Sequence, residues 1–208
     1  MLLVVGNKNY SSWSLRAWLA MKVLGMRFRE LRIPLYLPES KRELLQYSPA
    51  GKVPCLVDGE THVWDSLAIL EYLAERNPAL WPADPALRAR ARSISAEMHS
   101  GFPNLRQHMC MNIRKRHPGK GRRPEVLAEI SRIVDIWSDC RGPYLFGGFT
   151  AADAMYAPVV LRFRTYEVDL PPVCRAYAER VLALPALQDW MRDAERETEV
   201  LPQFEPYA

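Results

Sequence analysis

Residues 51–73 read GKVPCLVDGETHVWDSLAILEYL, and this stretch decides the fold. Two β-rich runs flank Asp58-Gly59, a pair typical of tight hairpin turns because glycine tolerates a positive φ. Ser66 then precedes apolar residues at helical spacing, and we expect it to cap the helix that follows. The stretch therefore predicts a hairpin followed directly by a helix, with free backbone groups at Val53 and free helix N–H groups at Ser66. Such groups suit a peptide backbone that carries a carboxylate.

The residues that precede this stretch complete a sheet. Two apolar runs, at 2–5 and 28–33, flank a helical pattern over 12–24, and this order and spacing are typical of a βαβ unit with two parallel strands. Together with the hairpin, the unit predicts a four-stranded mixed sheet with helices packed on it, which is a thioredoxin-like arrangement. The four cysteines include no Cys-x-x-Cys pair, so the redox motif of thioredoxins is missing.

The composition changes after residue 78, where three prolines between 78 and 85 interrupt any regular element. We therefore predict a thioredoxin-like domain at 1–78, a linker at 79–85 and an all-helical domain at 86–208. Apolar residues at helical spacing predict helices over 87–113, 125–140, 151–163 and 173–192. Thr150 and Asp153 form the pattern of a capping box at the third of these helices.

The overall composition is that of an ordinary globular protein of 208 residues, with 49% apolar and 25% charged side chains. The net charge of +4 is too small to indicate a nucleic-acid partner. No apolar stretch is long enough to span a membrane, and the N-terminal apolar run is too short for a signal peptide. The cysteines are scattered and suggest a reducing compartment rather than a disulfide framework, so we expect a cytoplasmic protein.

Four motifs in this order make the chain resemble the cytosolic glutathione transferases over essentially its whole length. The motifs are YSSWSLR at 10–16, SPAGKVP at 48–54, DSLAILEYL at 65–73 and GFTAAD at 148–153. A double serine at the start of the first helix is most similar to the serine-type, zeta-like bacterial members. Zeta-like members have a cysteine after the two serines, and here that position is Trp13.

The resemblance implies that glutathione is the co-substrate and that a serine hydroxyl stabilises its thiolate. A free thiol is mostly protonated at neutral pH, and a hydroxyl donor at a helix N-terminus favours the reactive thiolate through a charge-assisted hydrogen bond and the helix dipole. By motif position Ser11 corresponds to the catalytic serine of zeta-like members, and Ser12 is the second candidate. The alternative is that both serines only cap the helix.

The same resemblance implies how the peptide is held. The Val53–Pro54 bond is expected to be cis, as in the family, which turns the N–H and C=O of Val53 toward the cysteinyl part of glutathione. The helix start at Ser66 suits the γ-glutamyl carboxylate, and Asp65 is placed to neutralise the ammonium. Lys52 is a further candidate contact, although a solvated loop charge is the more common role of such a lysine.

A pocket for the second substrate is expected beside the first half of the long helix. Its candidate lining residues are Trp13, Met98, Phe102, Leu105, Arg106 and Met109. Four of them repeat at i, i+4, i+7 and i+11 and so share one helical face, a pattern that core packing also produces. Gly101 and Pro103 predict a kink in the same helix. The basic run 114–123 is interpreted as a solvated loop, with an anion-attracting rim as the alternative.

Together these features predict a glutathione transferase that activates the thiolate for attack on a small, apolar electrophile. We expect a homodimer with a role in detoxification and without a metal, membrane or nucleic-acid partner. Isomerisation of a maleyl dicarboxylate ranks lower, because the resemblance places an arginine where this chain has Thr165. Arg162 and Arg164 are near, but they lie at other angles of the helix. The remaining alternative is a non-catalytic, transferase-like module for dimerisation or regulation.

Overall fold

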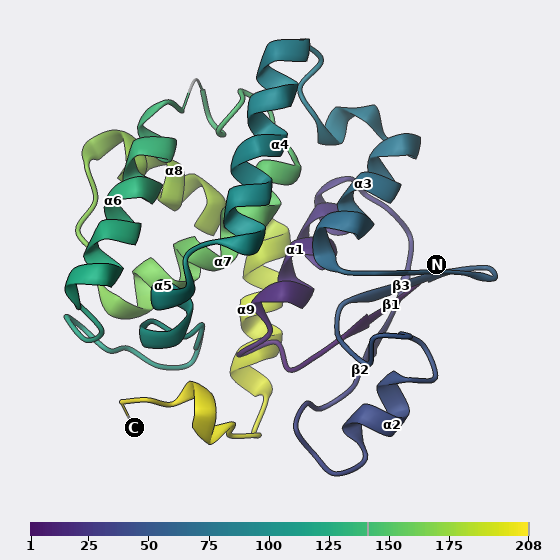
Figure 1. The fold of residues 1–208 in the computed structure, drawn as a ribbon. Helices are drawn as coiled ribbons and strands as arrows, with labels where there is room; N and C mark the ends of the chain where they lie inside the picture. Colours follow the sequence, from purple (N-terminus) through teal and green to yellow (C-terminus); the bar gives the residue numbers. More distant parts are fainter. Residues whose placement is uncertain (141, 208) are drawn as a thin grey trace.

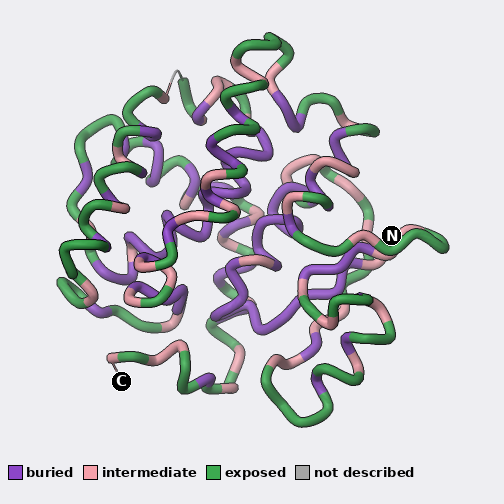
Figure 2. Tube along the Cα trace, in the orientation of Figure 1, coloured by how far each residue is buried: buried purple, intermediate pink, exposed green. Residues whose placement is uncertain are grey.

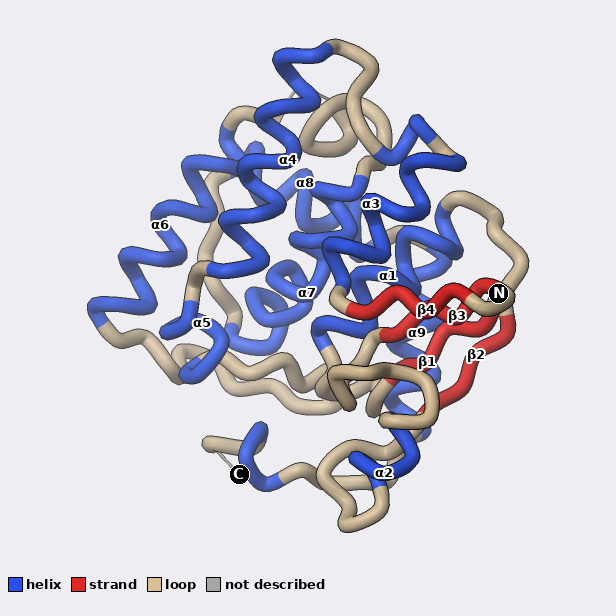
Figure 3. Tube along the Cα trace, turned by 45° about the vertical axis from the view of Figure 1, so that its right-hand side comes forward, coloured by secondary structure: helices blue, strands red, loops and turns tan. Residues whose placement is uncertain are grey.

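The computed structural model of the chain describes residues 1–140 and 142–207. Within this part of the chain four strands form one sheet, seen on one side of the molecule in Figure 3, and helices make up most of the rest. The strands are β1 (Leu2–Val5), β2 (Arg29–Arg32), β3 (Cys55–Asp58) and β4 (Thr61–Trp64). They are ordered β2-β1-β3-β4, with β1 and β2 parallel and the other pairs antiparallel. The predicted mixed sheet is confirmed.

The two faces of the sheet carry different helices because side chains alternate along a strand. The covering helices are α1 (Ser12–Val23), α2 (Ser40–Leu44) and α3 (Ser66–Arg76). Leu3 and Val5 are fully buried in the main core together with residues of α1 and α3. Val4 and Cys55 lie in a smaller cluster that α2 completes through Leu44. The helix α2 escapes sequence analysis, since five residues are too few to show a helical period.

The second half of the chain is helical, and two of its predicted helices are each divided. Its elements are η1 (Pro78–Leu80), α4 (Pro85–Ser100), α5 (Pro103–His108), α6 (Pro124–Ser138), α7 (Ala151–Tyr166), α8 (Pro172–Leu182), α9 (Pro185–Arg196) and η2 (Pro202–Phe204). A single helix over 87–113 is wrong, because Phe102 adopts a left-handed backbone (φ 59°) directly before Pro103, which has no N–H for a helical bond. The stretch 173–192 also breaks, before Pro185, where Leu184 has an extended backbone (φ −57°, ψ 123°).

The helix α1 lies in the middle of the molecule (Figure 1) and is buried along most of its length (Figure 2). It packs against α3 on one side and against α7 and α9 of the helical half. The rings of Trp18 and Trp190 meet there, with 5.1 Å between their centroids. One hydrophobic core therefore runs through both halves, and it includes Leu80 and Trp81 of the predicted linker. The domain boundaries stay a prediction.

The loop between β1 and α1 is held by charged groups from elsewhere in the chain. The ammonium of Lys8 lies 2.8 Å from Glu30 Oε1 and 2.8 Å from Asp193 Oδ2 on α9. Directly after α9, the Glu197 carboxylate accepts hydrogen bonds from the backbone N–H groups of Lys8 (2.6 Å) and Asn9 (3.0 Å). The chain immediately before α1 is thus fixed by residues near the C-terminus.

The predicted capping box of α7 is confirmed. The Asp153 side chain is fully buried and accepts hydrogen bonds from the Thr150 N–H (2.7 Å), the Thr150 hydroxyl (2.9 Å) and the Leu145 N–H (3.1 Å). Burial raises the pKa of Asp153 to about 6, while these three donors oppose the rise. The box joins the start of α7 to the loop before it.

Replacing Asp153 by alanine is expected to lower the free energy of unfolding by about 1–3 kcal/mol, because buried donors are left without an acceptor. Asp84 is a matched control, since it caps α4 at the surface through one bond from the Leu87 N–H (2.8 Å). Asp84→Ala should cost less, because water can replace the lost acceptor. Urea unfolding of both variants measures the difference. A smaller loss in Asp153→Ala than in Asp84→Ala would contradict the structural role of the box.

Candidate active site

The two predicted serines stand at the N-terminus of α1, and they differ in their hydrogen bonds. Ser11 is the N-cap: its Oγ accepts from the Ser14 N–H (3.3 Å) and donates to Ser14 Oγ (2.8 Å). Ser14 Oγ in turn accepts from the Gly6 N–H (3.1 Å). The hydroxyl hydrogen of Ser11 is therefore already donated to another residue at the start of α1.

The hydroxyl of Ser12 meets a cation from the helical half. Its Oγ accepts a hydrogen bond from Nη2 of Arg162 on α7 (3.4 Å). The same guanidinium donates to the backbone carbonyls of Met109 (2.5 Å) and Arg106 (3.5 Å). Arg164, two residues further along α7, instead contacts Met191 Sδ of α9 (3.9 Å). Only the first of the two arginines on this helix reaches the serines.

Arg162 belongs to a cluster of three guanidinium groups, which we call the guanidinium cluster (Arg16, Arg106 and Arg162). Arg16 lies one turn after Ser12 on α1, is 1% exposed, and donates to Ser66 Oγ (3.5 Å). Arg106, on α5, donates to the carbonyls of Gly101 (3.0 Å) and His99 (3.3 Å). Across the described residues, no carboxylate forms a salt bridge with any of the three.

The environment of the guanidinium cluster penalises its positive charge. Burial, followed by repulsion from Arg106 and Arg162, holds the pKa of Arg16 well below its usual range. Burial also lowers the pKa of Arg162 to about 10, so that this group is still protonated at neutral pH. Asp65 attracts Arg16 and Glu129 attracts Arg106 electrostatically, but neither carboxylate forms a salt bridge with these groups. Burying a charge without a salt-bridge partner is costly. The cluster would therefore be stabilised by an anion.

Trp13 lies between two members of the guanidinium cluster. Its ring centroid is 4.4 Å from Cζ of Arg16 and 4.8 Å from Cζ of Arg106, distances at which cation–π attraction is effective. The edge of the His99 ring approaches it at 5.2 Å between centroids. Trp13, His99 and Arg106 are all partly exposed. They form the accessible side of the site.

The start of α3 differs from the prediction by one residue. Asp65, not Ser66, is the N-cap, and its Oδ1 accepts from the N–H groups of Leu67 (2.9 Å) and Ala68 (3.4 Å). The capping prediction for Ser66 is wrong because Asp65 adopts the non-helical backbone (φ 75°), whereas Ser66 is already the first helical residue. Ser66 is fully buried, with its hydroxyl against Arg16.

The expected cis peptide bond between Val53 and Pro54 is present. Val53 is half-buried and precedes the first residue of β3, Cys55, which pairs with Val4 of β1. Lys52 is exposed, and its N–H bonds to Ser48 Oγ (3.5 Å). The backbone of Val53 thus lies just outside the ladder of the sheet.

Most of the predicted pocket wall is core. Met98, Phe102, Leu105 and Met109 are at most 6% exposed and belong to the main hydrophobic core. This burial supports the alternative that the stripe packs the interior. Trp13 and Arg106 are the two predicted lining residues that stay partly exposed. A wall built from them is polar and cationic as well as aromatic.

Sequence reasoning missed the positions of Arg16 and Arg162 in the site. A signal existed for the first, since Ser12 and Arg16 are four residues apart and so share one face of α1. The basic run is also less solvated than predicted. Arg114 donates to Tyr10 Oη (3.1 Å) and to the Glu199 carbonyl (2.6 Å), and His117 is buried.

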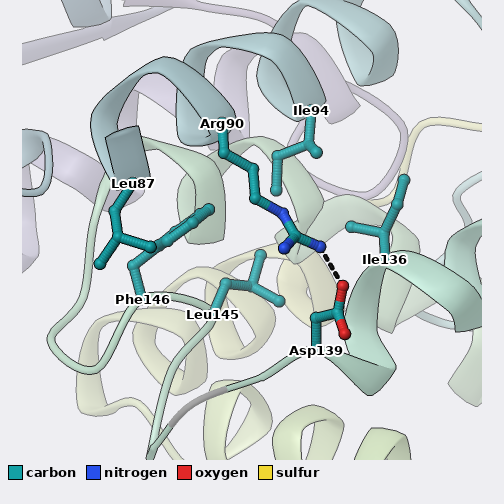
Figure 4. A pocket seen from close by; sticks show the side chains of 7 residues that line it. All are labelled: Leu87, Arg90, Ile94, Ile136, Asp139, Leu145 and Phe146. Carbon is teal, nitrogen blue, oxygen red and sulfur yellow. Dashed lines mark hydrogen bonds and ion pairs between the residues drawn. The ribbon is translucent and has the colours of Figure 1, made fainter. Parts of the chain in front are cut away.

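Two hollows on the surface lie away from the serines. The first is lined by Leu87, Arg90, Ile94, Ile136, Asp139, Leu145 and Phe146, and Figure 4 shows the side chain of Arg90 reaching across it to Asp139. The second is a groove between α3, the start of α4 and the loop before α7. Neither includes a serine or a member of the guanidinium cluster, so neither is the candidate active site.

Among residues 1–140 and 142–207, no three His, Cys, Asp or Glu side chains group as a metal site. In the same part of the chain, no helix is long and apolar enough to cross a membrane.

Two family models match the chain. The model described as "Glutathione S-transferase, N-terminal domain" matches residues 10–76, and "Glutathione S-transferase, C-terminal domain" matches residues 120–193. A protein of Caenorhabditis elegans, described as a probable maleylacetoacetate isomerase, is 32% identical over 169 residues. The match covers 77% of this chain and 78% of that relative.

Two solved structures share the fold. A glutathione transferase homolog from Burkholderia with bound glutathione has a TM-score of 0.73 at 24% identity, over 94% of this chain and 98% of that one. A maleylacetoacetate isomerase from Methylobacterium extorquens, with bound malonate and glutathione, has a TM-score of 0.71 at 22% identity. That match covers 97% of this chain and all of the other.

Proposed function

The chain belongs to the glutathione S-transferase family, and we propose that it activates the thiolate of glutathione beside Ser12 for reaction with a small, negatively charged electrophile. Glutathione is its co-substrate, and family membership favours an enzyme over a non-catalytic module. The observation that carries the proposal is the guanidinium cluster, which touches Ser12 and forms no salt bridge with a carboxylate among the described residues.

Glutathione is proposed to lie along the start of β3 and the start of α3. A helix start leaves N–H groups without intrahelical partners, and Asp65 takes those of Leu67 and Ala68. The N–H of Ser66 is left for the γ-glutamyl carboxylate, aided by the helix dipole. Val53, just outside the sheet ladder, offers its backbone N–H and C=O to the cysteinyl part. Lys52, exposed beside it, is the candidate contact for the glycyl carboxylate.

The hydrogen bonds favour Ser12 over Ser11 as the residue that stabilises the thiolate. The hydroxyl hydrogen of Ser11 is donated to Ser14 Oγ, whereas Ser12 Oγ accepts from Arg162 and keeps its own hydrogen for another acceptor. The neighbouring guanidinium makes that hydroxyl a stronger donor and adds a positive charge near the sulfur. Both effects lower the pKa of the bound thiol.

Ser12→Ala is expected to lower kcat at neutral pH by about tenfold to a hundredfold, the effect of losing one hydrogen bond to a charged group. Without the donor the pKa of the bound thiol rises, so the rising limb of the pH–rate profile moves to higher pH. Kinetics from pH 5 to 9 measure both changes.

Ser11→Ala is the matched control. It removes the cap of α1 and should cost about 0.5–2 kcal/mol of stability, with a smaller change in the pH profile. If Ser11→Ala moves the rising limb and Ser12→Ala does not, the assignment of the two serines is reversed.

The guanidinium cluster points to an anionic rather than an apolar electrophile. The apolar residues predicted to line the pocket are buried in the core, while Trp13 and Arg106 are the accessible ones. A carboxylate beside Trp13 would supply a directly bound counter-charge and accept a bidentate pair of hydrogen bonds from a guanidinium. Charge neutralisation in a buried site is worth more than the same contact in water.

A pair of electrophiles tests this charge preference. The wild type is expected to have a higher kcat/KM for an electrophile with a free carboxylate than for its methyl ester. In Arg106→Gln the ratio of kcat/KM for the acid to kcat/KM for the ester should fall by about tenfold to a hundredfold, because a hydrogen bond to a charged group is lost. The ratio is measured within each variant, so a partial loss of folded protein cancels.

Arg92→Gln is the control, since Arg92 is an exposed arginine of α4 that pairs with Glu71 (3.1 Å). The ratio should not change in this variant. Equal turnover of acid and ester by the wild type would rule out an anionic electrophile.

Isomerisation of a maleyl dicarboxylate is a second candidate. The nematode relative is described as a probable maleylacetoacetate isomerase, and two carboxylates would match two arginines of the cluster better than one. In that reaction glutathione adds to the double bond and leaves again, whereas conjugation consumes it. Titration of free thiol during turnover of a maleyl dicarboxylate separates the two: a constant thiol concentration with formation of the trans product indicates isomerisation.

A homodimer is proposed to form over the groove between α3 and α4. The groove has an aromatic floor that includes Trp81, with Glu75 on one helix and Arg88 on the other. A two-fold axis through such a face places the acidic side of one copy against the basic side of the other.

A cytoplasmic location and a part in detoxification are proposed on family membership alone. Cell fractionation tests the location, and growth of a deletion strain in the presence of electrophiles tests the part in detoxification.

Sedimentation of the wild type is expected to give twice the mass of the chain. Glu75→Arg should shift the protein toward monomer, because it brings like charges together across the axis. Adding Arg88→Glu to that variant should restore the dimer. A monomeric wild type would refute this interface. So would a dimer whose mass is the same in the wild type, in Glu75→Arg and in the double variant.

A further inference from the structure

His99 joins the two halves of the protein at the site. It lies in the last turn of α4, and its Nε2 is 3.2 Å from Oδ2 of Asp65 at the start of α3. The edge of its ring also meets Trp13 of α1, at 5.2 Å between centroids. One imidazole from the helical half thus contacts both helix starts that the proposed function uses.

The two oxygens of the Asp65 carboxylate have different partners. Oδ1 caps α3 through the N–H groups of Leu67 and Ala68, whereas Oδ2 faces His99. Asp65 also has a positive φ (75°, with ψ 134°), which is uncommon for a residue other than glycine and persists only where surrounding contacts hold it. The contact with His99 is one of these.

The next residue, Ser66, depends on this arrangement. It is fully buried, and its hydroxyl accepts from Nη1 of Arg16 (3.5 Å). Arg16 thus holds the Ser66 side chain, and the backbone of Asp65 sets the direction of the Ser66 N–H. A change in the Asp65 backbone would turn this donor away from a bound carboxylate.

We propose that His99 is a positioning residue for glutathione: it holds the Asp65 carboxylate from the helical half and so orients the α3 start that binds the γ-glutamyl group. The proposal rests on the proposed function. Within the described part of the chain, Nδ1 of His99 is buried and has no hydrogen-bond partner, so Asp65 is the polar group on which the ring acts. Glutathione affinity is thereby coupled to the packing of α4 against α3.

The test is calorimetric titration of glutathione into purified variants, with kcat measured at saturating glutathione. His99→Ala is expected to weaken binding by about threefold to tenfold, the range of one net hydrogen bond, and to change kcat at saturating glutathione by a smaller factor. His99→Gln should restore most of the affinity, because its amide N–H can replace Nε2–H toward Asp65. His108→Ala, the same change on the neighbouring helix α5, should bind like the wild type.

A double-mutant cycle with Asp65→Asn separates positioning from a general loss of structure. Asparagine is as good an N-cap as aspartate, so this variant keeps α3 but loses the charge that pairs with His99. The double variant should bind glutathione no more weakly than the weaker single variant, because both changes break one contact. Thermal unfolding confirms that each variant is folded.

Two outcomes overturn the proposal: His99→Ala binds glutathione as tightly as the wild type, or the effects of His99→Ala and Asp65→Asn are additive. A wild type that does not bind glutathione at all is a different result, since it refutes the proposed function rather than the role of His99.

Discussion

The burial of α1 on nearly all sides is the constraint on which the rest of the structure depends. A helix in this position must satisfy its N-terminal donors without water. The Ser14 N–H donates to Ser11 Oγ and the Ser12 N–H to the Tyr10 carbonyl, while the Glu197 carboxylate fixes the loop ahead of them through the Lys8 N–H. Because Ser11 is used in this way, the proposed function assigns the stabilisation of the thiolate to the next hydroxyl along the helix.

The same burial explains the unusual electrostatics of the site. Arg16 and Arg162 are almost fully buried. Among the described residues, the acceptors of their hydrogen bonds are carbonyl and hydroxyl oxygens rather than carboxylates. Such groups cost stability in the empty protein. Under the proposed function, an anionic substrate offsets that cost on binding, so a destabilising feature of the fold would contribute to affinity and selectivity.

Three contacts in the site join the two halves of the chain or join α1 to α3. Ser12 meets Arg162 of α7, Arg16 meets Ser66 of α3, and Asp65 meets His99 of α4. The proposed glutathione site and the proposed electrophile site are therefore parts of one network rather than the separate property of each half. The continuous hydrophobic core gives this network a rigid support.

The sequence by itself determined the sheet, the hairpin, the capping box of α7 and the family, because these depend on neighbours a few residues apart: turn residues, strand alternation and helical period. Only the tertiary structure decided that the apolar stripe on α4 and α5 is core, that Asp65 caps α3, and that Arg162, 150 positions from Ser12, completes the site. Helical period fixes which residues share a face, but it cannot say what covers that face. Where a buried charge finds its partner is settled by the packing of distant segments, and no local pattern contains that information.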